Sequence, residues 1–290
     1  MKKSISLTWL VPIIVILSAI LAIVGLITAN DGFVYSFTNV HGQTIQMDGR
    51  GIYKYDSLLA AAGFRGTNAV MLLFAIPLLV IAYIAYLKGS IKGGILLLGA
   101  LLPFLYCGAS MTFSAAFSDL FLGYTALLST SFFATITVIS SINLQLVDKR
   151  IKPGFPYKGI GIILIIAGFG TLFIWMSELL PALFSGSVPE TLGPYTTMFT
   201  HGFDSAIISP AFILIGIYSL KHKPLGVVLA APFLILCVLV GFFVIGQSIA
   251  QYLAGLIFPI NVYIGLVGSW VLLGVIAIGF TITYFRNIQD

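Results

Sequence analysis

The stretch 221–248 reads KHKPLGVVLAAPFLILCVLVGFFVIGQS, a short basic turn followed by a long run of apolar residues. A run of about 20 apolar residues is what an α-helix needs to cross the hydrocarbon core of a bilayer. Seven further runs of this kind occur in the chain. In order, the eight runs are Thr8–Ala29, Asn68–Leu87, Gly93–Phe113, Leu120–Asn143, Gly159–Leu180, Phe203–Leu220, Leu225–Ser248 and Pro259–Phe285. The sequence therefore predicts an all-α integral membrane protein with eight transmembrane helices.

The few charged residues are distributed unevenly between the gaps that separate these runs. Only 8% of the residues are charged, and 59% are hydrophobic. Alternate gaps hold most of the basic residues, namely Lys2, Lys3, Lys88, Lys92, Lys149, Arg150, Lys152, Lys158, Lys221, Lys223 and Arg286. The positive-inside rule places such gaps in the cytoplasm. We therefore expect a multi-pass protein of the cytoplasmic membrane with both termini cytoplasmic and the lipid bilayer as its immediate partner.

The space between the runs excludes several classes of protein. The longest cytoplasmic gap, about 145–158, is too short for a nucleotide-binding motor or a kinase domain. The net charge of +5 divides into a basic inner side and a mildly acidic outer side. This charge reflects membrane topology and contact with anionic lipid, so we expect no nucleic-acid partner. Residues 1–290 are predicted to form a single polytopic membrane domain.

Long and short outer loops follow one another in the same order twice along the chain. A long outer loop at about 30–67 follows the first run, and another at about 181–202 follows the fifth. This order favours an internal repeat of two parallel four-helix halves, 1–148 and 149–290, related by an axis along the membrane normal.

Two short sequence matches accompany this predicted repeat. RGTN at 65–68 resembles HGFD at 201–204, and PFL occurs at both 103–105 and 232–234. Matches this short also arise by chance among apolar residues, so the alternative of eight unrelated helices stays open.

The first long outer loop carries the pattern of a small extracytoplasmic β-hairpin. Two stretches rich in β-branched and aromatic residues, Phe33–Thr38 and Gln43–Met47, flank a turn with the sequence NVHG. This arrangement predicts a hairpin near Val34–Met47. After it, Tyr55–Phe64 has helical spacing and is expected to lie along the outer interface. The second long loop contains several Pro and Gly residues and is expected to be irregular.

Polar side chains collect near the outer ends of the runs. No run carries a charged residue near its middle, which disfavours a proton-coupled carrier with ionisable groups at the midplane. We interpret the outer polar residues as the lining of an outward-facing vestibule that binds a small neutral or cationic solute. The alternative is that these residues merely mark where helices meet water. The predicted ligand-binding residues are Asp204, His201, Glu178, Asp119, Gln247, Gln251, Asn261 and Tyr106.

Three of these residues also form a set that could carry other chemistry. His201 and Asp204 lie three residues apart at the start of one helix, and Glu178 ends the preceding helix. An imidazole with two carboxylates can bind zinc or act as acid and base. One histidine with two interfacial carboxylates is a common combination, however, and the sequence contains neither HExxH nor GxSxG. We therefore predict no metal, no cofactor and no catalytic residue.

Three functions remain open from the sequence. The leading hypothesis is a small-solute binding or transport component that works with partner membrane subunits. The second is a non-catalytic assembly subunit whose outer hairpin docks a partner. The third, which the missing motifs disfavour, is a membrane-embedded enzyme that uses His201, Asp204 and Glu178.

Overall fold

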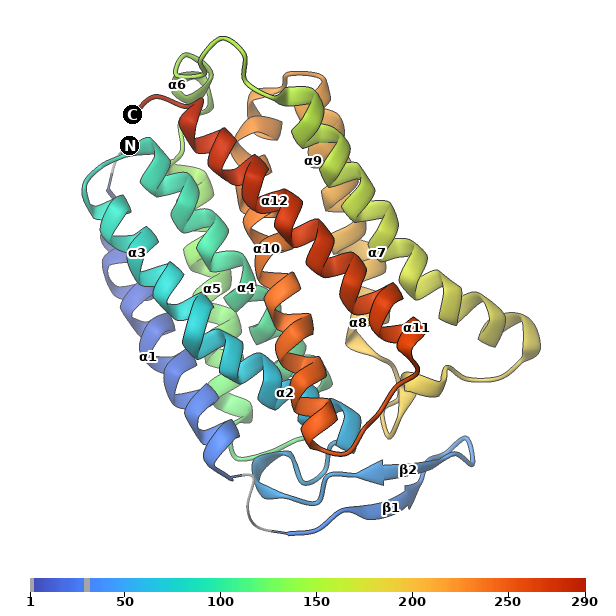
Figure 1. The fold of residues 1–290 in the computed structure, drawn as a ribbon. Coiled ribbons are helices and arrows are strands. Elements are labelled where there is room, and N and C mark those ends of the chain that lie inside the picture. The colour runs from blue at the N-terminus through green and yellow to red at the C-terminus, as the bar shows by residue number, and fades with distance from the viewer. Residues whose placement is uncertain (1–2, 29–31) are drawn as a thin grey trace.

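The structure is a computed structural model that describes residues 3–28 and 32–290 (Figure 1). Within these residues, eight helices are long and apolar enough to span a membrane, as the sequence predicts. The predicted end of the first run at Ala29 and the basic residue Lys2 lie outside the described residues. The eight spans are Ile5–Ile27, Leu58–Leu87, Ile91–Ser114, Phe121–Ser141, Tyr157–Ser185, Phe199–Leu220, Pro224–Leu253 and Ile260–Arg286.

Five of the spans are single α-helices, and three consist of consecutive helical segments. The single helices are α1 (Ile5–Ile27), α4 (Ile91–Ser114), α5 (Phe121–Ser141), α7 (Tyr157–Ser185) and α10 (Pro224–Leu253). The second span consists of α2 (Leu58–Val70), η3 (Met71–Ala75) and α3 (Ile76–Leu87). The sixth span consists of α8 (Phe199–Phe203), η5 (Asp204–Ile208) and α9 (Ser209–Leu220). The eighth span consists of α11 (Ile260–Val262), η6 (Tyr263–Gly268) and α12 (Ser269–Arg286). The segments η3, η5 and η6 are π-helical turns. Shorter helices in the loops are η2 (Gly51–Tyr53), α6 (Leu144–Asp148) and η4 (Glu190–Leu192).

The second span begins earlier than the apolar pattern indicates. The sequence predicts a separate interfacial helix at Tyr55–Phe64 and a span from Asn68, whereas one continuous helix runs from Leu58 to Leu87. Arg65 and Asn68 are therefore inside a helix, where their side chains bond to the outer loop. These internal bonds explain how polar residues can occupy the first turns of a span.

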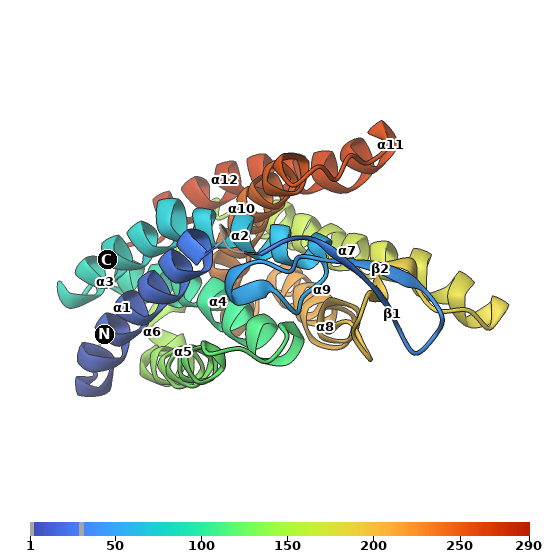
Figure 2. The same cartoon turned by 90° about the horizontal axis from the view of Figure 1, so that it is seen from below.

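The helices α4 and α10 form the centre of the bundle. In their most apolar windows, 72% of the residues in α4 and 61% in α10 are buried, more than in any other described span. We call the end of the bundle that carries the hairpin the outer end, after the topology that the sequence predicts. Viewed from this end, α5 and α12 lie on opposite sides of the central pair, and α1 with α3 lies opposite α7 with α9 (Figure 2). Both ends of the described chain lie at the same end of the bundle as α6, and the hairpin lies at the other end (Figure 1).

Glycines allow several helices to approach one another so closely that their main chains are in contact. A Cβ atom placed on Gly66 of α2 would lie 2.3 Å from the carbonyl oxygen of Gly246 in α10. A Cβ atom placed on Gly216 of α9 would lie 2.7 Å from the carbonyl oxygen of Gly161 in α7. Small residues at such contacts are typical of helix packing in membranes, because van der Waals contact replaces the hydrophobic driving force.

The predicted hairpin is present at the outer end of the bundle. Strands β1 (Tyr35–Thr38) and β2 (Thr44–Met47) pair antiparallel, with Tyr35 opposite Met47 and Thr38 opposite Thr44. The turn is fixed by Asn39, whose Oδ1 accepts hydrogen bonds from the backbone N–H groups of His41 and Gln43. Seen from the outer end, the hairpin lies across the helix ends rather than pointing away from them (Figure 2).

Candidate functional site

The structure divides the eight predicted ligand-binding residues into three groups. The first group consists of Tyr106, Glu178, His201 and Asp204, which are linked to one another through Trp175 and direct contacts. The second group, Gln247 and Gln251, lies on α10 and faces α2. The remaining two, Asp119 and Asn261, are exposed. The predicted residues therefore do not line one common vestibule.

Asp204 and His201 are the two buried members of the first group, and Asp204 is the carboxylate that bonds to Tyr106. Asp204 is only 7% exposed and is the first residue of the π-turn η5. The hydroxyl of Tyr106 in α4 donates a hydrogen bond to Oδ1 at 3.0 Å, and Nε1 of Trp175 in α7 donates to Oδ2 at 3.0 Å. The carboxylate thus joins three spans through two neutral donors.

The local winding of the sixth span explains the position of Asp204. Pro210 is the second residue of α9, and proline lacks the N–H that would bond to the preceding turn and clashes with its carbonyl group. The π-turn Asp204–Ile208 comes directly before this position. Single π-turns inside helices occur frequently at functional sites. The irregular winding therefore starts at the one carboxylate buried in this span.

His201 and Glu178 contact each other next to Asp204. The distance between His201 Nε2 and Glu178 Oε2 is 3.3 Å, and the Glu178 side chain is 25% exposed. The other carboxylate oxygen, Oε1, accepts hydrogen bonds from the hydroxyl of Thr191 at 2.6 Å and from its backbone N–H at 3.2 Å. These contacts hold Thr191 of the second outer loop against α7 and α8. Glu178 does not end its helix as the sequence predicts, because α7 continues to Ser185.

Aromatic rings fill the space around these polar groups. The indole of Trp175 bonds to Asp204 and meets the His201 ring edge-on, with ring centroids 5.1 Å apart. On the other side, Phe199 and Phe203 each lie 5.9 Å from the ring of Tyr106. Trp175 is the member of this cluster that the sequence reasoning missed. Its position three residues before Glu178, on the same helix face, is the signal that could have suggested it.

The glutamine pair makes helix–helix contacts. Gln247 Nε2 donates to the hydroxyl oxygen of Thr67 at 2.9 Å, and Gln251 Nε2 lies 3.5 Å from the carbonyl oxygen of Leu59. An amide in an apolar span needs such partners, because an unpaired polar group is costly there. Both side chains therefore contribute to the packing of α10 on α2.

Two acidic residues outside the spans fix the outer loops. Asp48 is fully buried and accepts hydrogen bonds from Arg50 and, at both carboxylate oxygens, from Arg65. Asp56 is 1% exposed and accepts from the backbone N–H of Ala116 at 2.8 Å and from the hydroxyl of Tyr195 at 2.9 Å. The hairpin turn is tied to the second loop as well, because Asn39 Nδ2 donates to the carbonyl oxygen of Gly193 at 2.9 Å. The helix ends are therefore covered by loops that are bonded to one another.

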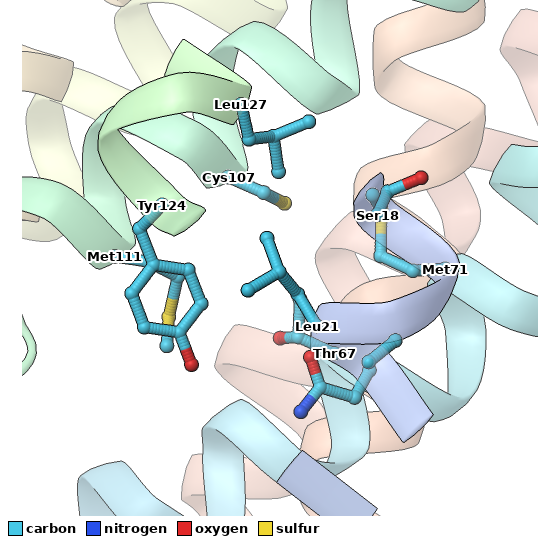
Figure 3. Close-up of a pocket in the computed structure, with 10 residues that line it drawn as sticks. Ser18, Leu21, Thr67, Met71, Cys107, Met111, Tyr124 and Leu127 are labelled. Atoms are coloured by element: carbon cyan, nitrogen blue, oxygen red, sulfur yellow. The ribbon is translucent and has the colours of Figure 1, made fainter. Parts of the chain in front are cut away.

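Two cavities lie away from the Asp204 cluster. The first, of about 30 Å³, lies between α1, the second span, α4 and α5, where it has room for about two water molecules (Figure 3). Ser18, Thr67, Cys107 and Tyr124 are among the side chains around it (Figure 3). The second, of about 250 Å³, is apolar and lies between α4, α5, α9 and α10, where Leu102, Leu214 and Phe233 line it.

A metal centre is not assembled from the described residues. Among residues 3–28 and 32–290, no group of three or more His, Cys, Asp and Glu side chains is placed to hold a metal ion. Cys107 and Cys237 are both buried as free thiols.

Comparison with known proteins gives no match: neither protein-family models nor curated proteins nor solved structures are significantly similar to the chain.

Proposed function

We propose that the chain is a multi-pass membrane component that binds a proton or a small cation at Asp204, near the outer end of the sixth span, and that works with partner subunits. The observation that carries this proposal is the environment of the Asp204 carboxylate. It is buried in a membrane-spanning segment, and its two hydrogen-bond donors, Tyr106 and Trp175, are both neutral.

A charge in this position is unfavourable unless something compensates it. Among the described residues, no lysine or arginine forms an ion pair with Asp204, and His201, the nearest basic residue, pairs with Glu178. Removing a carboxylate from water without a cation is costly, so the carboxyl group takes up a proton or pairs with a cation. Ionisable residues in spanning segments are therefore functional-site candidates by default.

The size of the site limits the ligand. Phe199 and Phe203 cover Tyr106, and Trp175 fills the space between Asp204 and His201. Each carboxylate oxygen already accepts one donor, which leaves a lone pair on each for a proton or a bare cation. This favours a small cation over the small neutral solute that the sequence also allowed.

The proposal is tested by thermal unfolding of the purified protein in detergent. Sodium, lithium, potassium and ammonium chloride are compared with an organic-cation chloride at equal concentration. A ligand that binds only the folded state raises its stability in proportion to the logarithm of concentration over Kd. We expect one of the small cations, or a lower pH, to stabilise the wild type and not Asp204→Asn.

Infrared spectroscopy separates the two kinds of ligand. A proton on Asp204 gives a carboxylic-acid band that disappears in Asp204→Asn, whereas a bound cation leaves the group ionised. Asp119→Asn is the matched control, because Asp119 is an exposed carboxylate at the outer side. If Asp204→Asn responds to cations and pH as the wild type does, Asp204 is a structural polar group and the proposal is wrong.

The second candidate function, an assembly subunit, is favoured by the closed outer end. The ribbon formed by β1 and β2 carries Tyr35 and Phe37 on one face, at 37% and 44% exposure, and Val40 at its turn is 89% exposed. Ordered apolar side chains at the water side of a membrane protein are typical of a protein contact. An assembly subunit should co-purify with one partner in fixed stoichiometry, and Tyr35→Ser with Phe37→Ser should remove that partner without affecting any cation response.

A further inference from the structure

At the outer end of each half of the chain, a basic side chain contacts a carboxylate. In the first half, Arg65 of α2 contacts Asp48 through Nη2 and Oδ2 at 2.6 Å. In the second half, His201 of α8 contacts Glu178 through Nε2 and Oε2 at 3.3 Å. In both halves, a basic residue near the outer start of the second span thus pairs with a carboxylate that precedes it in the chain.

The residue three positions after each basic residue bonds to a tyrosine hydroxyl. Asn68 donates from Nδ2 to the hydroxyl oxygen of Tyr53 at 2.8 Å, and Asp204 accepts from the hydroxyl of Tyr106 at 3.0 Å. The two tyrosines differ in their place in the fold, because Tyr53 belongs to η2 in the first outer loop and Tyr106 to α4.

Both spans also change their winding in the same way, but in a different register from the basic residues, because the π-turn starts six residues after Arg65 and three residues after His201. The π-turns Met71–Ala75 and Asp204–Ile208 each contain five residues, and each is followed by a twelve-residue helix. The second residue of that helix is a proline in both halves, Pro77 in α3 and Pro210 in α9. The placement of the other helices on opposite sides of α4 and α10 is the arrangement expected of two parallel halves (Figure 2).

The two ion pairs differ in one chemical property. A guanidinium keeps its charge at every physiological pH, so the contact between Arg65 and Asp48 is permanent. Histidine is the side chain that changes charge between about pH 5 and 8. We propose that both contacts act as locks on the outer loops, and that the second is a proton-dependent lock, which holds the second outer loop on α8 while His201 is protonated. This proposal goes beyond the Asp204 site and holds whether or not Asp204 binds a cation.

The contacts of Glu178 show what this second lock would release. Thr191 of the second outer loop bonds to Glu178 and lies 3.5 Å from His201 Nε2. Among the described residues, the charged groups that face His201 are Glu178 from α7 and Asp204 on its own span, while Trp175 and Thr191 are neutral. Loss of the proton from His201 removes its attraction to Glu178, and the segment 187–203 then loses one of its contacts to a charged group, while Thr191 still bonds to Glu178 and Tyr195 to Asp56.

Hydrogen–deuterium exchange of the full chain in lipid nanodiscs tests the lock. Rates at about pH 5.5 and about pH 8 are each divided by the intrinsic exchange rate at that pH. In the wild type, we expect 187–203 to exchange about tenfold faster at the higher pH. A change of this size corresponds to the free energy of one hydrogen bond to a charged group. His201→Arg should keep the segment slow at both pH values, and His201→Gln should leave it fast at both.

Three further variants test whether the pH dependence of the second outer loop belongs to His201. His222→Arg, on an inner turn, should behave as the wild type does, and Asp204→Asn should keep the pH dependence of 187–203. Arg65→His should give the first outer loop a pH dependence that exceeds the wild-type dependence there. The proposal is overturned if wild-type 187–203 exchanges equally at both pH values, or if its pH dependence is as large in His201→Arg and His201→Gln as in the wild type. Any smaller pH dependence that remains in both variants comes from Asp56, which bonds to Tyr195 of this segment and has a pKa of about 6.

Discussion

The hydroxyl of Tyr195 donates a hydrogen bond of 2.9 Å to Oδ1 of Asp56 and so joins the second outer loop to the first. The same oxygen accepts the backbone N–H of Ala116, whereas Oδ2 is buried and has no hydrogen-bond partner among the described residues. Burial raises the pKa of Asp56 to about 6, although both hydrogen bonds act in the opposite direction. Burial and the nearby Asp56 also raise the pKa of Tyr195, which therefore remains a donor.

Asp56 should make the protein less stable as the pH rises. Its pKa is higher in the folded chain than the usual 3.8, so the folded state holds the proton more tightly than the unfolded state does. This stabilisation is complete below about pH 4 and is lost as the pH passes through about 6, which amounts to up to about 3 kcal/mol. Thermal unfolding across this range should show a steeper decline in the wild type than in Asp56→Asn. Equal slopes would show that Asp56 is already ionised at low pH.

Among the contacts of the outer loops, the buried contact between Arg65 and Asp48 should contribute most to the stability of the protein. Arg65→Ala leaves the fully buried Asp48 carboxylate without its bidentate partner and should cost about 3–5 kcal/mol. Arg65→Lys should retain part of the stability, because an ammonium group cannot bond to both oxygens in the same fork. The measurement is thermal unfolding in detergent, with Lys54→Ala as the control because Lys54 is exposed. Equal effects of Arg65→Ala and Lys54→Ala would contradict this assignment.

The number of spans and the hairpin could be predicted from sequence because both depend on local patterns. An uninterrupted apolar run predicts a span, and the β-branched and aromatic residues of Val34–Met47 predict strands around a turn. The partners of the polar residues could not be predicted in the same way. A helix that is apolar on every side does not indicate which side faces which neighbour. The sequence thus brings Asp204 to the outer end, but the rotation of α4 and α7 decides that Tyr106 and Trp175 bond to it.

The same limit explains why the contacts of Gln247 and Gln251 could not be predicted from the sequence. Their spacing on α10 indicates a shared face, and both amides do face α2. Whether that face lines a vestibule or packs against a neighbouring helix depends on how closely α2 approaches α10. Gly66 and Gly246 allow the two backbones to touch, so the amides meet Thr67 and Leu59 instead of open space.

Gln247 should contribute to stability through its bond to Thr67. We expect Gln247→Leu to cost about 0.5–1.5 kcal/mol, the usual range for a neutral hydrogen bond. Gln251→Leu should cost less, because its amide nitrogen is 3.5 Å from the Leu59 carbonyl oxygen, at the limit of hydrogen-bond distance. A double-mutant cycle with Thr67→Val measures the coupling directly. If Gln247→Leu and Thr67→Val have fully additive effects, the contact contributes no stability.

The close contact between α2 and α10 should make Gly66 intolerant of even one methyl group. A Cβ atom at this position would lie 2.3 Å from the Gly246 carbonyl oxygen and 2.6 Å from the Gln247 Cα atom, both of which are main-chain atoms that cannot move independently of α10. Gly66→Ala must therefore push the helices apart, and overpacking of this kind costs about 1–3 kcal/mol.

Gly170 of α7 provides the matched control for this substitution. It is also a helical glycine, but a Cβ atom there would meet nothing within 4 Å. Because alanine loses less conformational freedom than glycine on folding, Gly170→Ala should be neutral or stabilising by up to about 1 kcal/mol. Opposite signs for the two substitutions in thermal unfolding would support backbone contact at Gly66. A stable Gly66→Ala protein would mean that α2 and α10 lie further apart than the structure has them.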